Sequence, residues 1–201
     1  MNKNILITGA TGALGSLTAK VFAMQGHNLI LMGTKQNKLD SLAKDLNLQN
    51  NRFLTQAVDL IDANALQTSV ETALSKFGSI HALFHLIGGW VGGKTFVDTS
   101  HDDLEFMLNQ HVRTTFNLFK SLSKPLSGNN WGRVIIVSAS TVPNPSGKSG
   151  VYTPAKAAQE NMVLNLAAEL KEFKVTANII QVRAIDVENK GTGTTPAEIV
   201  S

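Results

Sequence analysis

Residues 4–16 read NILITGATGALGS, an apolar run that leads directly into three glycines spaced three residues apart. The run Ile5–Ile7 predicts a short buried strand, and the larger apolar residues that follow at helical spacing predict a helix ending near Gly26. The residues expected on the buried face of this helix are Leu14, Leu17, Val21 and Met24. A strand, a glycine turn and a helix in this order are typical of a site that binds the phosphates of a dinucleotide.

The three glycines suit three different requirements of such a site. Gly9 permits a tight turn, Gly12 lets the backbone approach a pyrophosphate, and Gly15 lets the helix pack close to the strand. The N–H groups at the start of the helix would face the phosphates, with Thr11 and Leu14 beside them. A purely structural glycine turn is the alternative interpretation.

The composition is that of one globular domain. Of the 201 residues, 43% are hydrophobic and 16% are charged, so we expect a single dinucleotide-binding domain over residues 1–201. The net charge of +3 comes from scattered basic residues, which argues against a nucleic-acid-binding stripe. The absence of cysteine excludes disulfides and thiolate catalysis, and the five histidines have no metal-ligand spacing, so no metal site is predicted.

The start of the chain bears on its location in the cell. The first strand begins so close to Met1 that no room remains for a signal peptide, and no apolar run reaches membrane-spanning length. We therefore expect a cytoplasmic protein without membrane or nucleic-acid partners.

Strands and helices alternate along the rest of the chain. Further strands are predicted at residues 29–32, 53–58, 82–87, 134–137 and 177–182. Asp62 and Gly78 bound the helix after the third strand, Ser100 caps a long helix that Pro125 terminates, and a last helix is predicted at 152–170. Six strands linked by helices predict an α/β fold, a Rossmann-like doubly wound parallel sheet in three α/β/α layers.

The end of the second strand bears on the choice of cofactor. An acidic residue there would bind the ribose 2′-hydroxyl of NAD, but the sequence reads Gly33-Thr34-Lys35. Lys35 and the nearby Lys38 could bind a 2′-phosphate, which favours NADP(H), with NAD(H) as the other candidate. The alternative is that both lysines are ordinary surface residues of the following helix.

Two other strand ends carry residues with open interpretations. Asp59 either accepts a hydrogen bond from an adenine amino group or terminates the third strand. Residues 88–93 read GGWVGG after the fourth strand, at the edge where open α/β sheets bind ligands. Trp90 in this loop is either a lid or stacking residue, or an aromatic plug over the edge of the core.

Tyr152 and Lys156 lie four residues apart at the start of a predicted helix, so their side chains share one face. A lysine ammonium near a phenol lowers the tyrosine pKa, which makes Tyr152 a candidate proton donor to a carbonyl that receives a hydride. Tyr152 is also the only tyrosine in the chain.

Together these motifs resemble those of the short-chain dehydrogenase/reductase family, from residue 1 to about residue 187. Residues 8–15 resemble the cofactor loop, Asp59-Leu60 the pair that contacts adenine, and residues 85–88 (His-Leu-Ile-Gly) a strand-end Asn-Asn-Ala-Gly motif. The resemblance implies a nicotinamide cofactor, with Tyr152 as the acid/base and Lys156 bound to the nicotinamide ribose.

The resemblance also implies cofactor contacts from Gly88 and Ile185 and reduction of a small carbonyl or imine compound. Family dimers and tetramers imply that the helices at 101–124 and 152–173 pack against a second copy, giving a homodimer or homotetramer.

Several positions depart from the family pattern. The middle glycine falls at Gly12, one residue early, and the asparagine of the family's proton relay aligns with His111. The position of the carbonyl-orienting serine holds Ala139, with Ser138 and Ser140 on either side as candidate catalytic substitutes. Alternation along an extended strand would point both serines away from the direction of residue 139, so one substitutes only where the strand end twists or bulges.

Two further features set this chain apart within the family. Residues 12–16, residues 88–93 and the alanine at position 139 locally resemble dihydropteridine reductases, an NAD-using branch with an acidic residue that this chain lacks. Residues 191–201 resemble the segment that leads into a seventh strand, yet no further helix or strand is predicted, so we expect the sheet to lack its final strand.

The leading hypothesis is therefore an oxidoreductase that transfers a hydride between NADP(H) and a small carbonyl or imine substrate. The alternative is a non-catalytic or weakly active dinucleotide-binding protein that acts through oligomer or partner contacts, motivated by the changes at positions 139 and 111.

Overall fold

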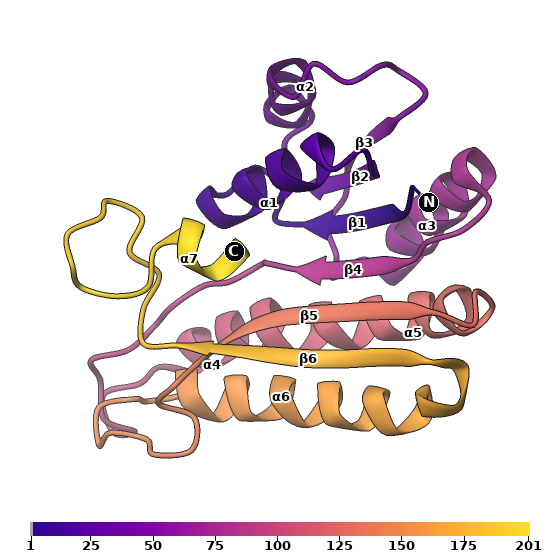
Figure 1. The fold of residues 1–201 in the computed structure, drawn as a ribbon. Coiled ribbons are helices and arrows are strands. Elements are labelled where there is room, and N and C mark those ends of the chain that lie inside the picture. Colours follow the sequence, from indigo (N-terminus) through magenta and orange to yellow (C-terminus); the bar gives the residue numbers. More distant parts are fainter. Residues whose placement is uncertain (1) are drawn as a thin grey trace.

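The computed structural model describes residues 2–201, in which six strands form one parallel sheet in the order β3-β2-β1-β4-β5-β6 (Figure 1). The strands are β1 (Asn4–Thr8), β2 (Asn28–Gly33), β3 (Phe53–Ala57), β4 (Ala82–His85), β5 (Gly132–Ala139) and β6 (Val175–Val182). The chain runs outward from β1 in one direction and then from β4 in the other, which confirms the predicted doubly wound, Rossmann-like sheet.

Helices cover both faces of the sheet and complete the three layers (Figure 1). Helices α1, α2 and α7 lie on one face, and α3, α5 and α6 on the other. The helical segments are α1 (Ala13–Met24), α2 (Gln36–Asp45), α3 (Ala63–Phe77), α4 (His101–Met107), η1 (Leu108–Arg113), α5 (Thr114–Ser127), α6 (Tyr152–Glu169), η2 (Lys171–Phe173) and α7 (Pro196–Val200).

Each face of the sheet has its own core, because successive strand residues point to opposite sides. Leu6 and Ile30 pack into the core formed with α3, α5 and α6. Ile5 and Leu29, one residue earlier in each strand, pack into the core formed with α1 and α2. The side chains of β1 are buried on both faces of the sheet, so the strand is held firmly at the centre of the fold. The glycine turn that follows Thr8 therefore starts from a fixed position.

The buried face of α1 includes the expected Leu14 but otherwise differs from the prediction, since Leu17 and Val21 are only half-buried. Thr18, Ala19 and Ala23 face the sheet, whereas Met24 is 76% exposed. Small residues bring the helix close to the strands, which leaves no depth for the larger side chains on that face. The predicted end is correct, since Gly26 takes a left-handed conformation (φ +86°) just after the helix.

The predicted long helix after Ser100 is one continuous helical run with a widened turn inside it. Ser100 caps α4 through a capping box with Asp103, as its sequence position indicated. The segment η1 then adopts π-helical hydrogen bonding before α5 begins. Pro125 does not terminate the helix as predicted, because α5 continues to Ser127; a proline so near the end removes only one amide donor from the last turn.

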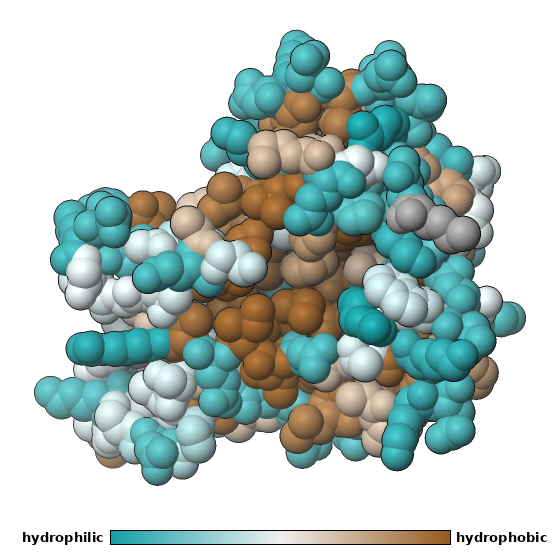
Figure 2. Space-filling view, in the orientation of Figure 1, coloured by the Kyte–Doolittle hydropathy of each residue, from teal (hydrophilic) through white to brown (hydrophobic). Residues whose placement is uncertain are grey.

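The C-terminal segment also differs from the prediction, because α7 forms where no helix was expected. Thr195 and Glu198 make a reciprocal capping box around Pro196, which favours a helix start. This helix packs on α1 and covers part of one sheet face. A hydrophobic patch stays visible on this face in Figure 2. Phe84, Ile135 and Ile180 of β4, β5 and β6 line a small pocket there together with Ile199 and Val200 of α7.

Within residues 2–201, no helix combines the length and the apolar character that crossing a lipid bilayer requires.

Candidate active site

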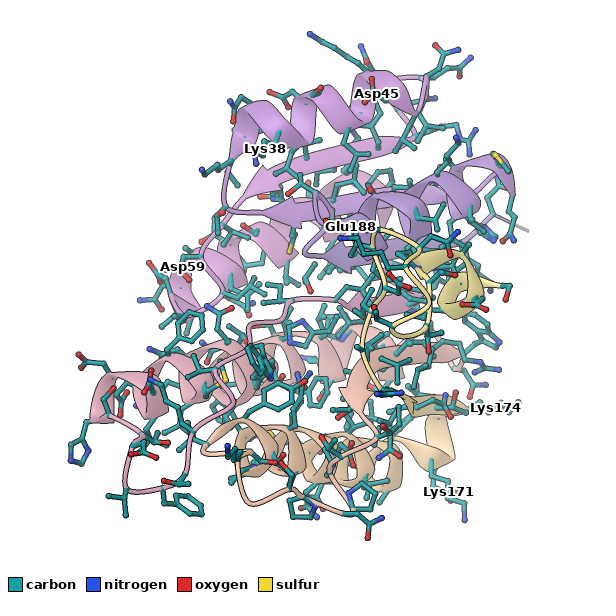
Figure 3. All side chains as sticks on the ribbon, turned by 90° about the vertical axis from the view of Figure 1, so that its left-hand side faces the viewer. Lys38, Asp45, Asp59, Lys171, Lys174 and Glu188 are labelled. Atoms are coloured by element: carbon teal, nitrogen blue, oxygen red, sulfur yellow. The ribbon has the colours of Figure 1, made fainter. Side chains whose placement is uncertain are left out.

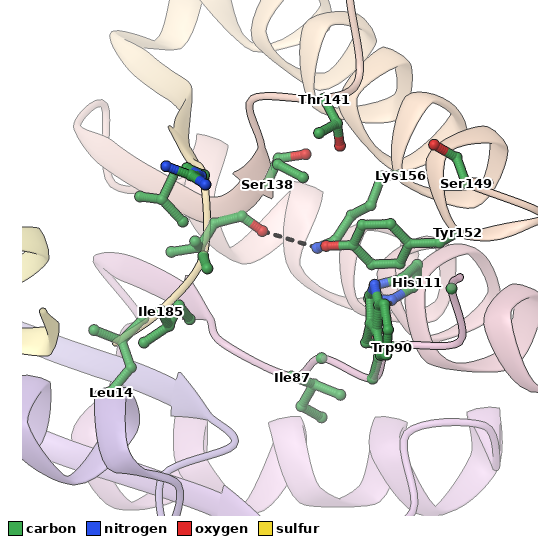
Figure 4. A pocket seen from close by; sticks show the side chains of 18 of the residues that line it. Leu14, Ile87, Trp90, His111, Ser138, Thr141, Ser149, Tyr152, Lys156 and Ile185 are labelled. Carbon is green, nitrogen blue, oxygen red and sulfur yellow. Dashed lines mark hydrogen bonds between the residues drawn. The ribbon is translucent and has the colours of Figure 1, made fainter. Parts of the chain in front are cut away.

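A cleft of about 660 Å³ opens at the carboxyl ends of β4, β5 and β6 (Figure 4). The start of α1 closes one end of it and the start of α6 lines the side opposite the glycine turn. The structure brings six of the predicted site residues into its lining: Leu14, Gly88, Ser138, Tyr152, Lys156 and Ile185.

The glycine turn between β1 and α1 adjoins this cleft. A Cβ on Gly9 (φ +66°) would lie 2.8 Å from the Leu86 carbonyl oxygen, and one on Gly15 would collide with the Gly9 carbonyl oxygen. Both glycines are therefore required by the packing of the chain alone, whether or not a ligand binds. This agrees with the alternative interpretation of a purely structural glycine turn. A Cβ on Gly12 would meet only the Gly9 carbonyl oxygen, at 3.3 Å.

The start of α1 suits an anion. Gly12 is its N-cap, no side chain caps it, and its first turn contains no acidic residue. The free amide N–H groups of such a first turn bind phosphate oxygens well. The residues present thus fit a dinucleotide pyrophosphate, with the missing side chain at Gly12 leaving the turn open to it.

The end of β2 lies directly beside the glycine turn, since a Cβ on Gly33 would be 3.7 Å from Thr11 Oγ1. Thr34, Lys35 and Lys38 follow and are exposed to solvent. Figure 3 looks onto the carboxyl edge of the sheet, and Lys38 and Asp59 are both seen at the left of this view. Neither Lys35 nor Lys38 is in an ion pair with another residue of the described chain.

Asp59 and Leu60 behave differently from one another. Asp59 is exposed, and its Oδ1 accepts a hydrogen bond from the Ile61 amide at 3.0 Å, which supports its interpretation as a strand terminator. The Leu60 side chain is buried in the core, and its carbonyl oxygen accepts from Asn117 at 2.9 Å. The side chain of Leu60 is therefore not available to a ligand.

Tyr152 and Lys156 both face the cleft from the first turns of α6 (Figure 4). Lys156 is only 5% exposed, and its Nζ donates to the Val137 carbonyl oxygen at 2.9 Å and to Gln159 Oε1 at 3.0 Å. Burial lowers the pKa of Lys156 to about 8. Burial raises the pKa of the Tyr152 phenol, which contradicts the expected lowering by the lysine.

The two serines beside Ala139 have different surroundings, because Ser138 is the last but one residue of β5 and Ser140 follows its end. Ser138 is buried in the lining of the cleft, and its Oγ has no hydrogen-bond partner within residues 2–201. Ser140 is exposed and does not line the cleft, while its amide N–H donates to the Val182 carbonyl oxygen. Ser138 and Ala139 both line the cleft because they form the carboxyl end of β5, so the expected alternation does not keep Ser138 out of the site.

His111 projects from the widened turn η1 toward Tyr152 (Figure 4). Its Nε2 donates to the Gly89 carbonyl oxygen at 2.9 Å, so the unpartnered Nδ1 carries no proton in the neutral ring. Burial, together with the charge of Lys156, lowers the pKa of His111 to about 4. His111 is therefore neutral at physiological pH. Its hydrogen bond to Gly89 links the glycine-rich loop at residues 88–93 to η1.

Trp90 lies at the mouth of the cleft and is 68% exposed, so it does not plug the core. Its ring lies so close to Gly92 that a Cβ there would be 2.6 Å from it. The lid or stacking interpretation is the one that this position suits.

Four residues of the site region escaped the sequence analysis. Lys148 and Arg183 line the cleft, and no Asp or Glu is among its described lining residues. Thr115 and Gln159 lie just behind it and are almost fully buried. Gln159 could have been found from its spacing. It follows Lys156 by three residues, so it lies on the same inward face of the helix, where a polar side chain is unusual. In residues 2–201, no three His, Asp or Glu side chains form a group that could hold a metal ion.

Comparison with known proteins identifies the sequence family. Residues 3–196 match the family model described as short chain dehydrogenase. Oxidoreductase UcpA from Salmonella typhimurium is 29% identical over 181 residues, which span 89% of this chain and 67% of UcpA. The chain thus spans about two thirds of the length of that relative.

Solved structures share the fold. ElxO with NADP bound has a TM-score of 0.83 at 20% identity, over 90% of this chain and 73% of ElxO. NAD⁺-bound xylitol dehydrogenase has a TM-score of 0.79 at 22% identity, over 89% of this chain and 69% of that enzyme.

Proposed function

The chain belongs to the short-chain dehydrogenase family, and on this basis we propose that it transfers a hydride between NADP(H) and a small carbonyl or imine substrate, with Tyr152 donating the proton. The observation that carries the proposal is the pairing of the only tyrosine with a buried lysine in one cleft that reaches the start of α1. The local resemblance to dihydropteridine reductases finds no support among the relatives, so pterin is not part of the proposal.

The residues that would hold the cofactor lie along the cleft. The amides at the start of α1 would bind the pyrophosphate, Leu14 and Ile185 would contact the ring system, and Lys156 would bind the ribose next to the nicotinamide. NADP(H) supplies or takes up the hydride when it is bound.

Tyr152 suits the role of a proton donor in its protonated form. Because burial raises the pKa of this phenol, it keeps its proton at neutral pH until a substrate oxygen gains negative charge. The ammonium of Lys156 stabilises the phenolate that remains. Ser138 Oγ, buried and without a partner in the described chain, would orient the substrate oxygen in place of the residue at position 139.

The charge of the cleft favours an anionic substrate. Lys148 and Arg183 line it together with Lys156, and its described lining includes no carboxylate. The cofactor would occupy the end near Leu14, which leaves the end near Lys148 and Ser149 for the substrate. A carbonyl compound that carries a carboxylate, sulfonate or phosphate group fits this end best.

The preference for NADP(H) rests on Lys35 and Lys38, which follow Gly33 at a strand end that lies beside Thr11 and has no acidic residue. An oligomer is also part of the proposal, since Phe116 on α5 and Leu164 on α6 are 55% and 58% exposed. Apolar side chains on these two helices suit a homodimer or homotetramer contact.

Titration of the purified chain with NADPH and with NADH, followed by cofactor fluorescence and thermal shift, tests the proposal. We expect NADPH to bind with about tenfold preference, and the double variant Lys35→Met/Lys38→Met to lose that preference. A Tyr152→Phe variant should bind NADPH normally and lose turnover by about 100-fold or more. Binding of neither nucleotide, or full turnover by the Tyr152→Phe variant, would overturn the proposal.

A further inference from the structure

A row of buried polar side chains connects the end of β1 to Lys156. It crosses from β1 through β4 and α5 to α6, and each member is 5% exposed or less. Its members are Thr8, His85, Thr115, Gln159 and Lys156.

The direction of each hydrogen bond follows from Thr115. Its Oγ1 lies 2.6 Å from the His111 carbonyl oxygen, which can only accept, so the single hydroxyl hydrogen of Thr115 is donated there. Thr115 Oγ1 must then accept in its other two contacts. These come from Gln159 Nε2 at 2.8 Å and His85 Nε2 at 3.1 Å.

The tautomer of His85 is fixed in consequence. Its Nε2 carries the hydrogen, and its Nδ1 accepts from Thr8 Oγ1 at 2.7 Å. Burial, reinforced by the charges of Lys156 and His111, lowers the pKa of His85 to about 3. The ring therefore stays neutral, with both nitrogens satisfied, throughout the physiological range.

The orientation of the Gln159 amide is fixed in the same way. Its Nε2 faces the accepting oxygen of Thr115, so its Oε1 faces Lys156 Nζ at 3.0 Å. Rotating the amide by half a turn would place an NH₂ group against an ammonium and a carbonyl against an oxygen that has no hydrogen left to donate. The row of buried side chains thus presents the Gln159 Oε1 acceptor to Lys156, and the Gln159 amide has no other favourable orientation.

Lys156 is held from two sides by this acceptor and by the Val137 carbonyl oxygen. An ammonium has three N–H donors, so one remains for the cleft. The titratable groups around it are Tyr152 and Glu160 on its own helix, His85 from β4 and His111 from η1, and both histidines are neutral.

We propose that Gln159 is a positioning residue that fixes the Lys156 ammonium beside Tyr152, and that Thr115 and His85 act through it by locking its amide. Only the importance of Lys156 for hydride transfer rests on the function proposed above. The positioning itself can be tested without turnover.

The pKa of Lys156 is the quantity to measure, by NMR of the full chain labelled with ¹³C in its lysine ε-carbons. A lysine that titrates near pH 8 is well separated from ordinary lysines, and its signal is identified by its loss in Lys156→Arg. Gln159→Met keeps the length of the side chain but removes the acceptor, so we expect the pKa of Lys156 to fall by about half a unit to one unit. Gln159→Glu keeps an acceptor and adds a negative charge, so the pKa should rise.

Thr115 supplies the matched pair. Thr115→Val frees the Gln159 amide and should lower the pKa of Lys156 by less than Gln159→Met does, whereas Thr115→Ser keeps the hydroxyl and should leave the pKa unchanged. In the double variant, the loss of Thr115 should add nothing to Gln159→Met, because both act through the same bond.

A merely space-filling Gln159 would leave the pKa of Lys156 unchanged in Gln159→Met, whereas the added charge of Gln159→Glu raises it in either case and serves as the control that the two side chains are in contact. An unchanged pKa of Lys156 in Gln159→Met would overturn the proposal. If Gln159→Met does not fold, a Thr115→Val protein with an unchanged pKa overturns it instead. Failure to bind NADPH would count against the proposed function but would leave this series of pKa values fully interpretable.

Discussion

The ring of His111 stands edge-on to the ring of Tyr152, with the centroids 5.9 Å apart and the planes at 80°. The same imidazole donates to the Gly89 carbonyl oxygen, so one side chain links the proton donor to the glycine-rich loop. At the position expected to align with an asparagine, the chain thus has a side chain that contacts both Tyr152 and the loop at residues 88–93.

This link predicts the effect of His111→Phe, which keeps an aromatic ring against Tyr152 but removes the N–H donor. The free energy of unfolding should fall by about 1 to 3 kcal/mol, because the Gly89 carbonyl loses its partner. Amide hydrogen exchange in residues 88–93 should speed up by more than that in β1, because exchange in this buried central strand follows only the global free energy of unfolding. Unaltered exchange in the loop would show that His111 does not hold it.

Acid should destabilise the protein through its two buried histidines. The pKa values of His85 and His111 are lowered to about 3 and about 4, so between pH 7 and pH 5 the unfolded chain takes up protons that the folded chain does not. Stability therefore decreases as the pH falls, by about 2 kcal/mol for each histidine over this interval. Denaturant unfolding at pH 7 and pH 5 measures the loss.

The variant His111→Asn is the control for this pH effect. It should show a loss between pH 7 and pH 5 that is smaller by about 2 kcal/mol than that of the wild type. The same loss in both proteins would contradict the assignment of the effect to His111.

Ser138→Ala and Ser140→Ala form a matched pair that tests which serine orients the substrate. Ser138 Oγ is buried in the cleft, whereas Ser140 is exposed outside it, so kcat/KM should fall by about 100-fold only in Ser138→Ala. NADPH binding should be the same in both variants. A larger loss in Ser140→Ala would mean that the end of β5 turns differently during catalysis.

Lys148→Met tests the expected preference for anionic substrates. With succinic semialdehyde the KM should rise roughly fivefold, because the charge contact is solvent-exposed, while with butanal it should stay the same. Steady-state kinetics with both aldehydes provide the comparison. Equal KM changes for the two would place the anion contact elsewhere in the cleft.

The fold was predictable because the strands are short apolar runs and most helices have explicit end signals. Asp62 and Gly78 bound α3 as expected, since one accepts from two amides of the first turn and the other takes the left-handed conformation. The buried face of α1 was not predictable from hydrophobicity, because Ala19 and Ala23 are chosen for closeness to the sheet. The helix α7 was overlooked although Thr195 and Glu198 have the spacing of a capping box.

The site was predictable only where its residues are neighbours in sequence. Tyr152 and Lys156 share a helix face, so their spacing alone places them together. Gln159 and Thr115 are 44 residues apart, and His85 and Thr115 are 30 apart, so their contacts follow only from the sheet order. The choice between Ser138 and Ser140 depended on where β5 stops, which is the least predictable property of a strand.

The widened turn η1 determines where the helical run formed by α4, η1 and α5 can lose a residue. A π-turn holds one residue more than the regular helix around it, and each residue rotates a helix by about 100°. Deleting a single residue from 108–113 would restore a regular helix and leave Thr115 nearly in register with the end of the run that Ser100 caps, because the widened turn spreads one extra residue over smaller rotations. A deletion scan across the run should therefore be tolerated better at this segment than inside α5, where the loss of one residue rotates everything beyond it by about 100°.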